Sequence, residues 1–120
     1  MSTLRDDILH RYGKGIRSFR GEELDSEVLD LRGTTLAGAD FSECFIFADF
    51  SDANLEGCRF VRANVKTCDF RGAILRGATF AGAAIDGATF DQPGLLAADF
   101  EGATEQGHVY RAGERPCAAV

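Results

Sequence analysis

Residues 58–80 read CRFVRANVKTCDFRGAILRGATF and divide into five-residue units that begin at Cys58, Ala63, Cys68, Ala73 and Ala78. The third place of each unit holds a large apolar residue: Phe60, Val65, Phe70, Leu75 and Phe80. A five-residue period matches neither the helical period of 3.6 nor the alternation of a straight strand. It fits a chain that turns a corner after every unit, often at a glycine in the fifth place.

A longer period appears when third-place residues twenty positions apart are compared. Three sets match, and a fourth is β-branched: Phe50, Phe70 and Phe90; Phe60, Phe80 and Phe100; Leu55, Leu75 and Leu95; Val65 and Ile85. The repeat therefore predicts a solenoid with four sides per coil, in which each side stacks its own residue type on neighbouring coils. Its interior would hold two phenylalanine ladders and two aliphatic ladders.

The register slips upstream, because Phe41 and Phe50 are nine residues apart instead of ten. A one-residue deletion places Phe41 on the Phe60 ladder, whereas a four-residue insertion would stack Phe41 on Val65. We favour the deletion because it keeps like residues together. About two extra residues within 25–30 then return Phe19 to the Phe41 ladder, so the predicted solenoid spans residues 19–105.

Several units carry a recognisable family signature: ADF at 39–41, 48–50 and 98–100, ANL at 53–55 and ANV at 63–65. The pattern resembles the A(D/N)LXX consensus of pentapeptide-repeat proteins. The resemblance implies an all-β fold, a right-handed quadrilateral β-helix, and it implies little about activity because family members differ widely. The departures from the consensus are Glu22, Leu29, Thr34, Pro93 and Glu105.

The two ends need caps, because a solenoid leaves an apolar rung open at each end. Residues 1–18 are predicted to form a helical cap and a linker, with a capping box from Thr3 to Asp6 and an end at Gly13. Residues 106–120 form a tail that either folds over Leu95 and Phe100 or leaves the last coil free to pair with a second copy. The resemblance implies dimerisation through the C-terminal coil, and we expect a monomer or such a homodimer.

Composition and the N-terminal sequence predict a single-domain cytosolic protein, and after the family resemblance we expect the bacterial cytosol. It has 120 residues and a net charge of −6, which argues against direct nucleic-acid binding. No apolar run is long enough to span a bilayer, and the acids near the N-terminus do not fit a signal peptide. Three of the four cysteines occupy places that alanine fills elsewhere, so they are interpreted as packing residues.

No enzymatic chemistry is predicted. The two histidines, His10 and His108, lie in the cap and the tail, away from any nucleophile pattern. The chain has no C-x-x-C pair, phosphate-binding loop or zinc-protease motif. We therefore predict no catalytic residue, no cofactor and no metal site.

Acidic residues are frequent at outward places, and some pentapeptide-repeat proteins imitate a DNA duplex. One coil opposes this interpretation, because its basic residues face only Asp69; these residues, the basic belt, are Arg59, Arg62, Lys66, Arg71 and Arg76. Four ion pairs are predicted between neighbouring coils: Glu43–Arg62, Glu56–Arg76, Lys66–Asp86 and Arg71–Asp91. The rod would also be short, about 20–25 Å for four to five coils.

Two apolar residues, Ile74 and Leu96, are predicted to point outward on one side, one coil apart. Together with the basic belt they are the candidate interaction surfaces. The function that the sequence favours is a non-catalytic, rigid interaction module or scaffold with an unidentified protein partner. The alternative is a DNA-mimicking regulator of DNA gyrase.

Overall fold

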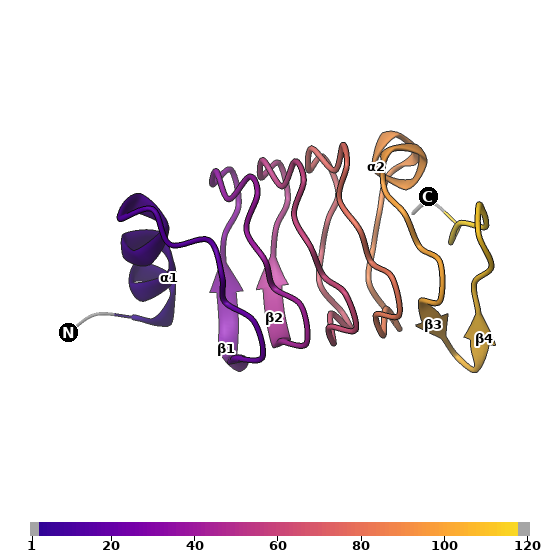
Figure 1. Cartoon of the computed structure of the whole chain (residues 1–120), viewed down its shortest axis with the longest axis horizontal. Coiled ribbons are helices and arrows are strands. Elements are labelled where there is room, and N and C mark those ends of the chain that lie inside the picture. Colours follow the sequence, from indigo (N-terminus) through magenta and orange to yellow (C-terminus); the bar gives the residue numbers. More distant parts are fainter. Residues whose placement is uncertain (1–2, 118–120) are drawn as a thin grey trace.

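A computed structural model describes residues 3–117 of the chain, which form a rod with extents of 41 × 24 × 23 Å. Helix α1 (Leu4–Gly13) lies at one end, and the parallel strands β1 (Glu23–Asp30) and β2 (Phe45–Asp49) belong to the first coils. Helix α2 (Gln92–Ala97) and the short antiparallel strands β3 (Thr104–Glu105) and β4 (His108–Val109) lie toward the other end (Figure 1).

The coil has four sides, named here by their inward ladders. Side A holds Phe19, Phe41, Phe60, Phe80 and Phe100; side B holds Leu24, Ile46, Val65 and Ile85; side C holds Leu31, Phe50, Phe70 and Phe90; side D holds Leu36, Leu55, Leu75 and Leu95. Most sides join the next coil through a single parallel bridge, such as Asn54 with Ile74. Each side is so short that most sides form only an isolated β-bridge and not a β-strand.

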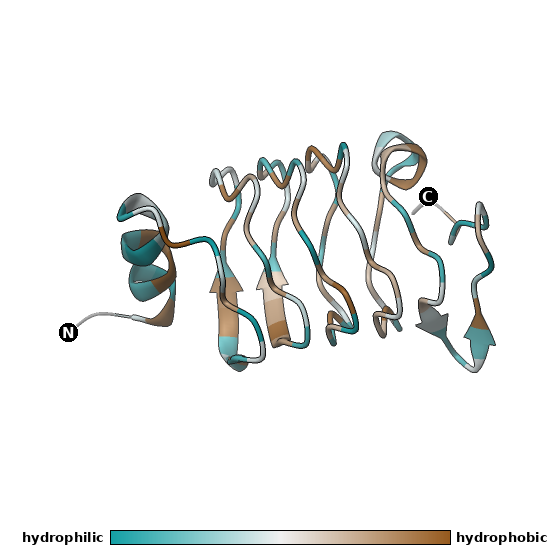
Figure 2. Ribbon diagram, in the orientation of Figure 1, coloured by the Kyte–Doolittle hydropathy of each residue, from teal (hydrophilic) through white to brown (hydrophobic). Residues whose placement is uncertain are grey.

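The phenylalanines of sides A and C form the centre of the core. Phe60 and Phe80 stack with ring centroids 4.9 Å apart at 3°, and Phe70 and Phe90 stack at 5.1 Å and 5°. Neighbouring ladders meet edge to face, as Phe80 and Phe90 do at 87°. Both geometries are favourable for aromatic pairs. The predicted twenty-residue superperiod is confirmed, and Figure 2 shows apolar and polar residues alternating along the coils.

The two predicted irregularities are confirmed at a single corner. Leu24 pairs with Ile46 and Leu29 pairs with Ala48, so β1 carries a bulge opposite a β2 segment that lacks a corner residue. Strand β2 therefore runs through the corner without the usual turn. Elsewhere the corner residue adopts a left-handed conformation, with φ of 72° at Gly77 and 62° at Thr67.

Helix α1 has the predicted capping box. The Asp6 amide donates to Thr3 Oγ1 at 3.1 Å, and the Thr3 amide donates to Asp6 Oδ2 at 3.4 Å. Ile8 is fully buried with the residues of the core. Arg11 donates two hydrogen bonds to Glu22, at 2.7 and 2.8 Å, and its guanidinium lies 4.7 Å from the Phe19 ring centroid.

Helix α2 was not predicted. Its sequence, QPGLLA, continues the five-residue register, yet it forms a helical turn instead of an extended side. Asp91 caps it by accepting from the Gly94 amide at 3.1 Å, and Pro93 occupies the first turn. Both residues favour helix initiation, and this local preference overrides the repeat. Leu95 stays buried, so the side D ladder keeps its inward residue.

The C-terminal tail lies over the last coil. The Gly102 amide donates to the Tyr110 carbonyl at 2.8 Å, and Arg115 Nε donates to the Leu95 carbonyl at 2.6 Å. The Tyr110 hydroxyl donates to Glu105 Oε1 at 2.6 Å, so the residue that breaks the repeat holds the tail in place. Phe100 and Leu95 are buried as a result, which agrees with the predicted lid.

Candidate interaction surfaces

The basic belt surrounds the rod instead of forming one face. Arg59 and Arg62 flank side A, and Lys66, Arg71 and Arg76 follow on sides B, C and D respectively. All five residues are exposed. Since its members point in four directions, a partner that approaches from one direction meets only part of the belt.

Two of the four ion pairs predicted between coils form. Arg62 Nη2 lies 2.8 Å from Glu43 Oε1, and Arg76 Nε lies 3.6 Å from Glu56 Oε2.

The other two predicted pairs are wrong. Arg71 pairs with Asp69 in its own unit at 2.7 Å, and within residues 3–117 Lys66 has no carboxylate oxygen within 4.0 Å. Asp91 accepts from the Gly72 amide, and Asp86 accepts from the Gln106 amide. These carboxylates therefore bond to backbone amides and not to the basic belt.

The Asp69–Arg71 pair is the best-defined ion pair of the belt. Arg71 donates to Asp69 from its side chain and from its amide, and the Thr89 hydroxyl also donates to Asp69. These bonds to the charged form, led by the Arg71 side chain, hold the pKa of Asp69 far below its usual range. They also hold Arg71 against its own coil, so its charge contributes mainly to local structure.

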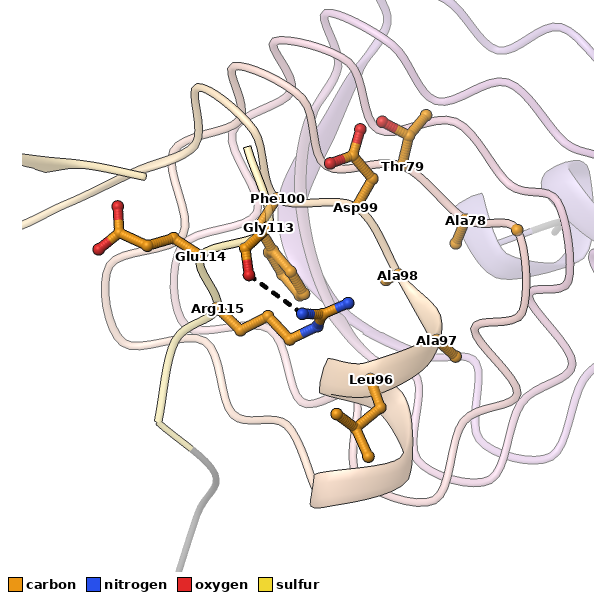
Figure 3. Close-up of a pocket in the computed structure, with 11 residues that line it drawn as sticks. Ala78, Thr79, Leu96, Ala97, Ala98, Asp99, Phe100, Gly113, Glu114 and Arg115 are labelled. Atoms are coloured by element: carbon orange, nitrogen blue, oxygen red, sulfur yellow. Dashed lines mark hydrogen bonds between the residues drawn. The ribbon is translucent and has the colours of Figure 1, made fainter. Parts of the chain in front are cut away.

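Side D carries the two exposed apolar residues that the sequence predicts. Ile74 is 47% exposed and Leu96 is 60% exposed, as the sequence predicts. Two hollows flank α2: one of about 350 Å³ is lined by Ile74, Leu75, Pro93 and Ala97, among others. The second, of about 490 Å³, is bordered by Leu96 on α2 and by Arg115 on the tail (Figure 3).

The ladder of hydrogen bonds ends at α2. On side D the Leu55 amide donates to the Ile74 carbonyl at 2.9 Å, and the Gly57 amide donates to the Arg76 carbonyl at 2.8 Å. The equivalent amides one coil further, those of Leu75 and Gly77, donate no hydrogen bond within the described residues. The helix takes the place of the strand that would accept them. Leu75 is buried and Gly77 is exposed, so side D combines exposed apolar groups with one unpaired amide on an exposed residue, that of Gly77.

A second group of exposed apolar residues was not predicted from the sequence. Phe45 and Phe47 flank buried Ile46 on β2 and are 49% and 38% exposed, while Val28 on the β1 bulge is 61% exposed. We call these three residues the side B patch. The signal was present, because Phe45 occupies the second place of its unit just as Ile74 does. The deleted corner residue obscured the place of Phe47.

Three of the four cysteines are buried, and Cys117 is exposed. Burial raises the pKa of the Cys58 and Cys68 thiols to about 12, and of Cys44 to about 11, so they are poor nucleophiles. His108 contacts Glu114 at 3.2 Å and His10 is exposed on α1. Residues 3–117 contain no cluster of metal-ligating side chains and no helix long and apolar enough to cross a bilayer.

The repeats match the family model for pentapeptide repeats in eight copies, over residues 29–64 and 48–92. The matched ranges cover more than half of the chain. This protein belongs to the pentapeptide-repeat family. A comparison with curated proteins found no match.

Three solved structures of similar proteins are compared with this chain, and one of them reaches a TM-score of 0.50. The chain is 31% identical to a pentapeptide repeat protein of the Arabidopsis thaliana thylakoid lumen, covering 77% of this chain and 69% of that chain with a TM-score of 0.50. It is 18% identical to HetL of the cyanobacterium Nostoc, a pentapeptide repeat protein involved in heterocyst differentiation regulation (86% and 72% covered, TM-score 0.33). It is 20% identical to QnrB1, a plasmid-mediated fluoroquinolone resistance protein (72% and 64%, TM-score 0.26). The last two similarities are too remote to bear on function.

Proposed function

We propose that this protein is a non-catalytic interaction module that binds a segment of a protein partner on side D. The observation that carries this proposal is the interruption of the ladder at α2. It leaves the amides of Leu75 and Gly77 without acceptors, next to exposed Ile74 and Leu96. Because α2 covers the edge at Leu75, the partner segment would bind beside the helix, with apolar side chains against Ile74 and Leu96 and in the two hollows that flank α2.

Family membership supports this class of function, because pentapeptide-repeat proteins are generally structural or interaction modules. Rigidity supports it as well. A coil whose rings are stacked loses little conformational freedom when a partner binds. We also infer that α1 acts as the N-terminal cap, because it buries Ile8 and places Arg11 over the Phe19 ring. The right-handed sense of the coil stays a prediction of the resemblance.

The oligomeric state that we propose is a monomer. The tail covers Leu95 and Phe100, which are the residues that a C-terminal dimer contact would need. The location that we propose is the cytosol, which is supported by the free thiols of Cys44, Cys58 and Cys68.

The geometry gives no support to DNA mimicry. Such a protein needs a continuous acidic surface, and the basic belt interrupts the acids on all four sides. We expect no inhibition or protection of DNA gyrase at micromolar protein in a supercoiling assay. Protection at that concentration would restore the alternative.

A capture experiment tests the proposal. The wild-type chain and an Ile74→Ser/Leu96→Ser variant would be immobilised and exposed to a native bacterial lysate, and bound proteins would be identified by mass spectrometry. We expect the variant to lose the specific partner. A charge-reversed Arg59→Glu/Arg62→Glu/Arg71→Glu variant is the matched control and should keep it. Retention by the side D variant together with loss by the control would refute the assignment to side D.

A further inference from the structure

The side B patch lies on a different side of the coil from Ile74 and Leu96. Phe45 and Phe47 alternate with Ile46, so both project from the same outward face of β2. The β1 bulge that carries Val28 lies opposite Phe47, because the paired residues on either side of it are Leu24 with Ile46 and Leu29 with Ala48. Two separate irregularities in the repeat thus bring three apolar side chains to one corner.

Equivalent positions in the later coils are not aromatic. Asn64 and Ala84 follow Phe45 down the ladder of side B, and Lys66 and Asp86 occupy places equivalent to that of Phe47. The repeat therefore does not require aromatic residues at these outward places. Phe45 and Phe47 are 49% and 38% exposed, and this apolar surface is unfavourable in water. A bound apolar group would bury it and so gain free energy.

A hollow of about 220 Å³ adjoins the patch. Phe45 and Phe47 line it together with Asp25 of the bulge and with Asn64, Lys66 and Thr67 of the next coil. Ligand pockets for small molecules have volumes of about 300–1,000 Å³. This hollow is smaller, so it suits a single protruding side chain better than a cofactor or metabolite.

The charges around the hollow are unbalanced. Glu23, Asp25 and Glu27 are exposed on β1, and none of them forms an ion pair within residues 3–117. Another acidic residue of the first coils does form ion pairs: Glu43 pairs with Arg20 and Arg62. Lys66 is the single basic residue among those that line the hollow. A partner with adjacent basic residues would neutralise the three carboxylates.

We propose that the side B patch binds a peptide segment of another protein in which an aliphatic or aromatic residue stands next to lysine or arginine. The apolar residue would enter the hollow between Phe45 and Phe47. The basic neighbours would reach Glu23, Asp25 and Glu27 on β1. The net charge of −6 favours the approach of such a basic segment.

A second copy of this chain fits less well as the occupant. A two-fold contact places the same patch on both partners. Glu23, Asp25, Glu27 and Lys66 accompany each patch, so two net-negative rims would face each other across the phenylalanines. The proposal is also independent of the proposed function, since no residue of the side B patch lines either hollow on side D.

Selection from a displayed library of random peptides tests the proposal without assuming a partner. The full chain is the target, and a Phe45→Ser/Phe47→Ser variant is used for counter-selection. We expect the surviving peptides to combine an aliphatic or aromatic residue with neighbouring lysine or arginine. Labelled synthetic copies should bind the full chain in a fluorescence anisotropy titration, and the affinity should fall with added salt.

Two variants separate the apolar and the charged contributions. A Glu23→Lys/Asp25→Lys/Glu27→Lys variant keeps both phenylalanines and should bind the selected peptides at least tenfold more weakly. A Leu96→Ser variant on side D should bind them as the wild type does. Circular dichroism melting would show that each variant is folded; if the double serine variant unfolds, Phe47→Ser alone replaces it.

Three results would overturn the proposal: no enrichment against the counter-selected variant, enrichment of acidic or uncharged peptides, or undiminished binding to the triple lysine variant. Light scattering covers the remaining occupant. A wild-type dimer that Phe47→Ser converts to a monomer would show that the patch binds a second copy, and this result would also overturn the proposal.

Discussion

The coils from Ala48 to Phe90 and the coils before them follow the same plan with different regularity. In the later coils Phe60 and Phe80 stack at 4.9 Å and 3°, with side-chain planes almost parallel. In the earlier coils Phe41 and Phe60 stack at 5.5 Å and 15°. The earlier coils are also the ones that contain the corner that lost a residue after Ile46 and the bulge in β1.

The comparison shows where such a solenoid tolerates change. A corner can gain or lose residues because it faces solvent, whereas a buried ring that slipped by one place would leave a cavity and displace its neighbours. The ladders therefore survive in both regions. The irregular corner has a different consequence, since Phe45, Phe47 and Val28 become exposed there.

The largest expected loss of stability is for a phenylalanine in the middle of a ladder, compared with one at its end. Phe70 stacks on Phe50 and Phe90 and meets the edges of Phe60 and Phe80, so Phe70→Ala should lower the free energy of unfolding by about 4 kcal/mol. Phe19→Ala should cost clearly less, because this ring stacks only on Phe41 within the described residues. Urea denaturation measures both. Equal costs would contradict the ladder model.

The next effect concerns the cap. Arg11→Gln removes two charged hydrogen bonds to Glu22 and the contact with the Phe19 ring, and we expect a loss of about 2 kcal/mol. Arg71→Gln is the matched control in the regular coils, where the arginine side chain is 59% exposed, and it should cost much less because exposed ion pairs contribute little to stability. The same urea titrations compare them. A control that costs as much as Arg11→Gln would remove the special role of the cap.

A stabilising change is expected at one regular corner. Thr67 has φ of 62°, a conformation that is unfavourable for a β-branched residue. Thr67→Gly should raise the free energy of unfolding by about 1 kcal/mol, measured by thermal or urea denaturation. Gly77→Thr, at a corner with φ of 72°, is the reverse control and should destabilise the protein. A destabilised Thr67→Gly variant would show that the threonine side chain contributes more than its backbone costs.

The smallest effect depends on pH. The pKa of Asp69 is lower in the folded protein than in the unfolded chain, mainly because Arg71 binds the carboxylate. Its contribution is therefore complete above the unfolded pKa of about 4 and is lost as the pH falls toward the folded pKa. We expect wild type to exceed Asp69→Asn by about 0.5 kcal/mol at pH 7, and by progressively less below pH 4. A difference that is constant between pH 7 and pH 3 would contradict this assignment.

The inward-facing residues could be predicted from the sequence because few residue types are acceptable at those places. Each inward place must be apolar and must fit the residue above and below it, so Phe41 could be assigned to the Phe60 ladder despite the missing corner residue. The outward half is less constrained. Lys66 and Asp86 occupy equivalent places without pairing, since exposed side chains gain little from one fixed partner.

The four ladders, the burial of Cys44, Cys58 and Cys68 and both register slips could be derived from the amino-acid sequence, because they follow from stacking like residues at a fixed period. The structure was needed to show that QPGLLA forms α2, since the sequence carries two competing signals there, the cap at Asp91 and the repeat. It also decided which surfaces are available. The unpaired amide of Gly77, and the approach of the β1 bulge to Phe47, depend on how one coil lies against the next.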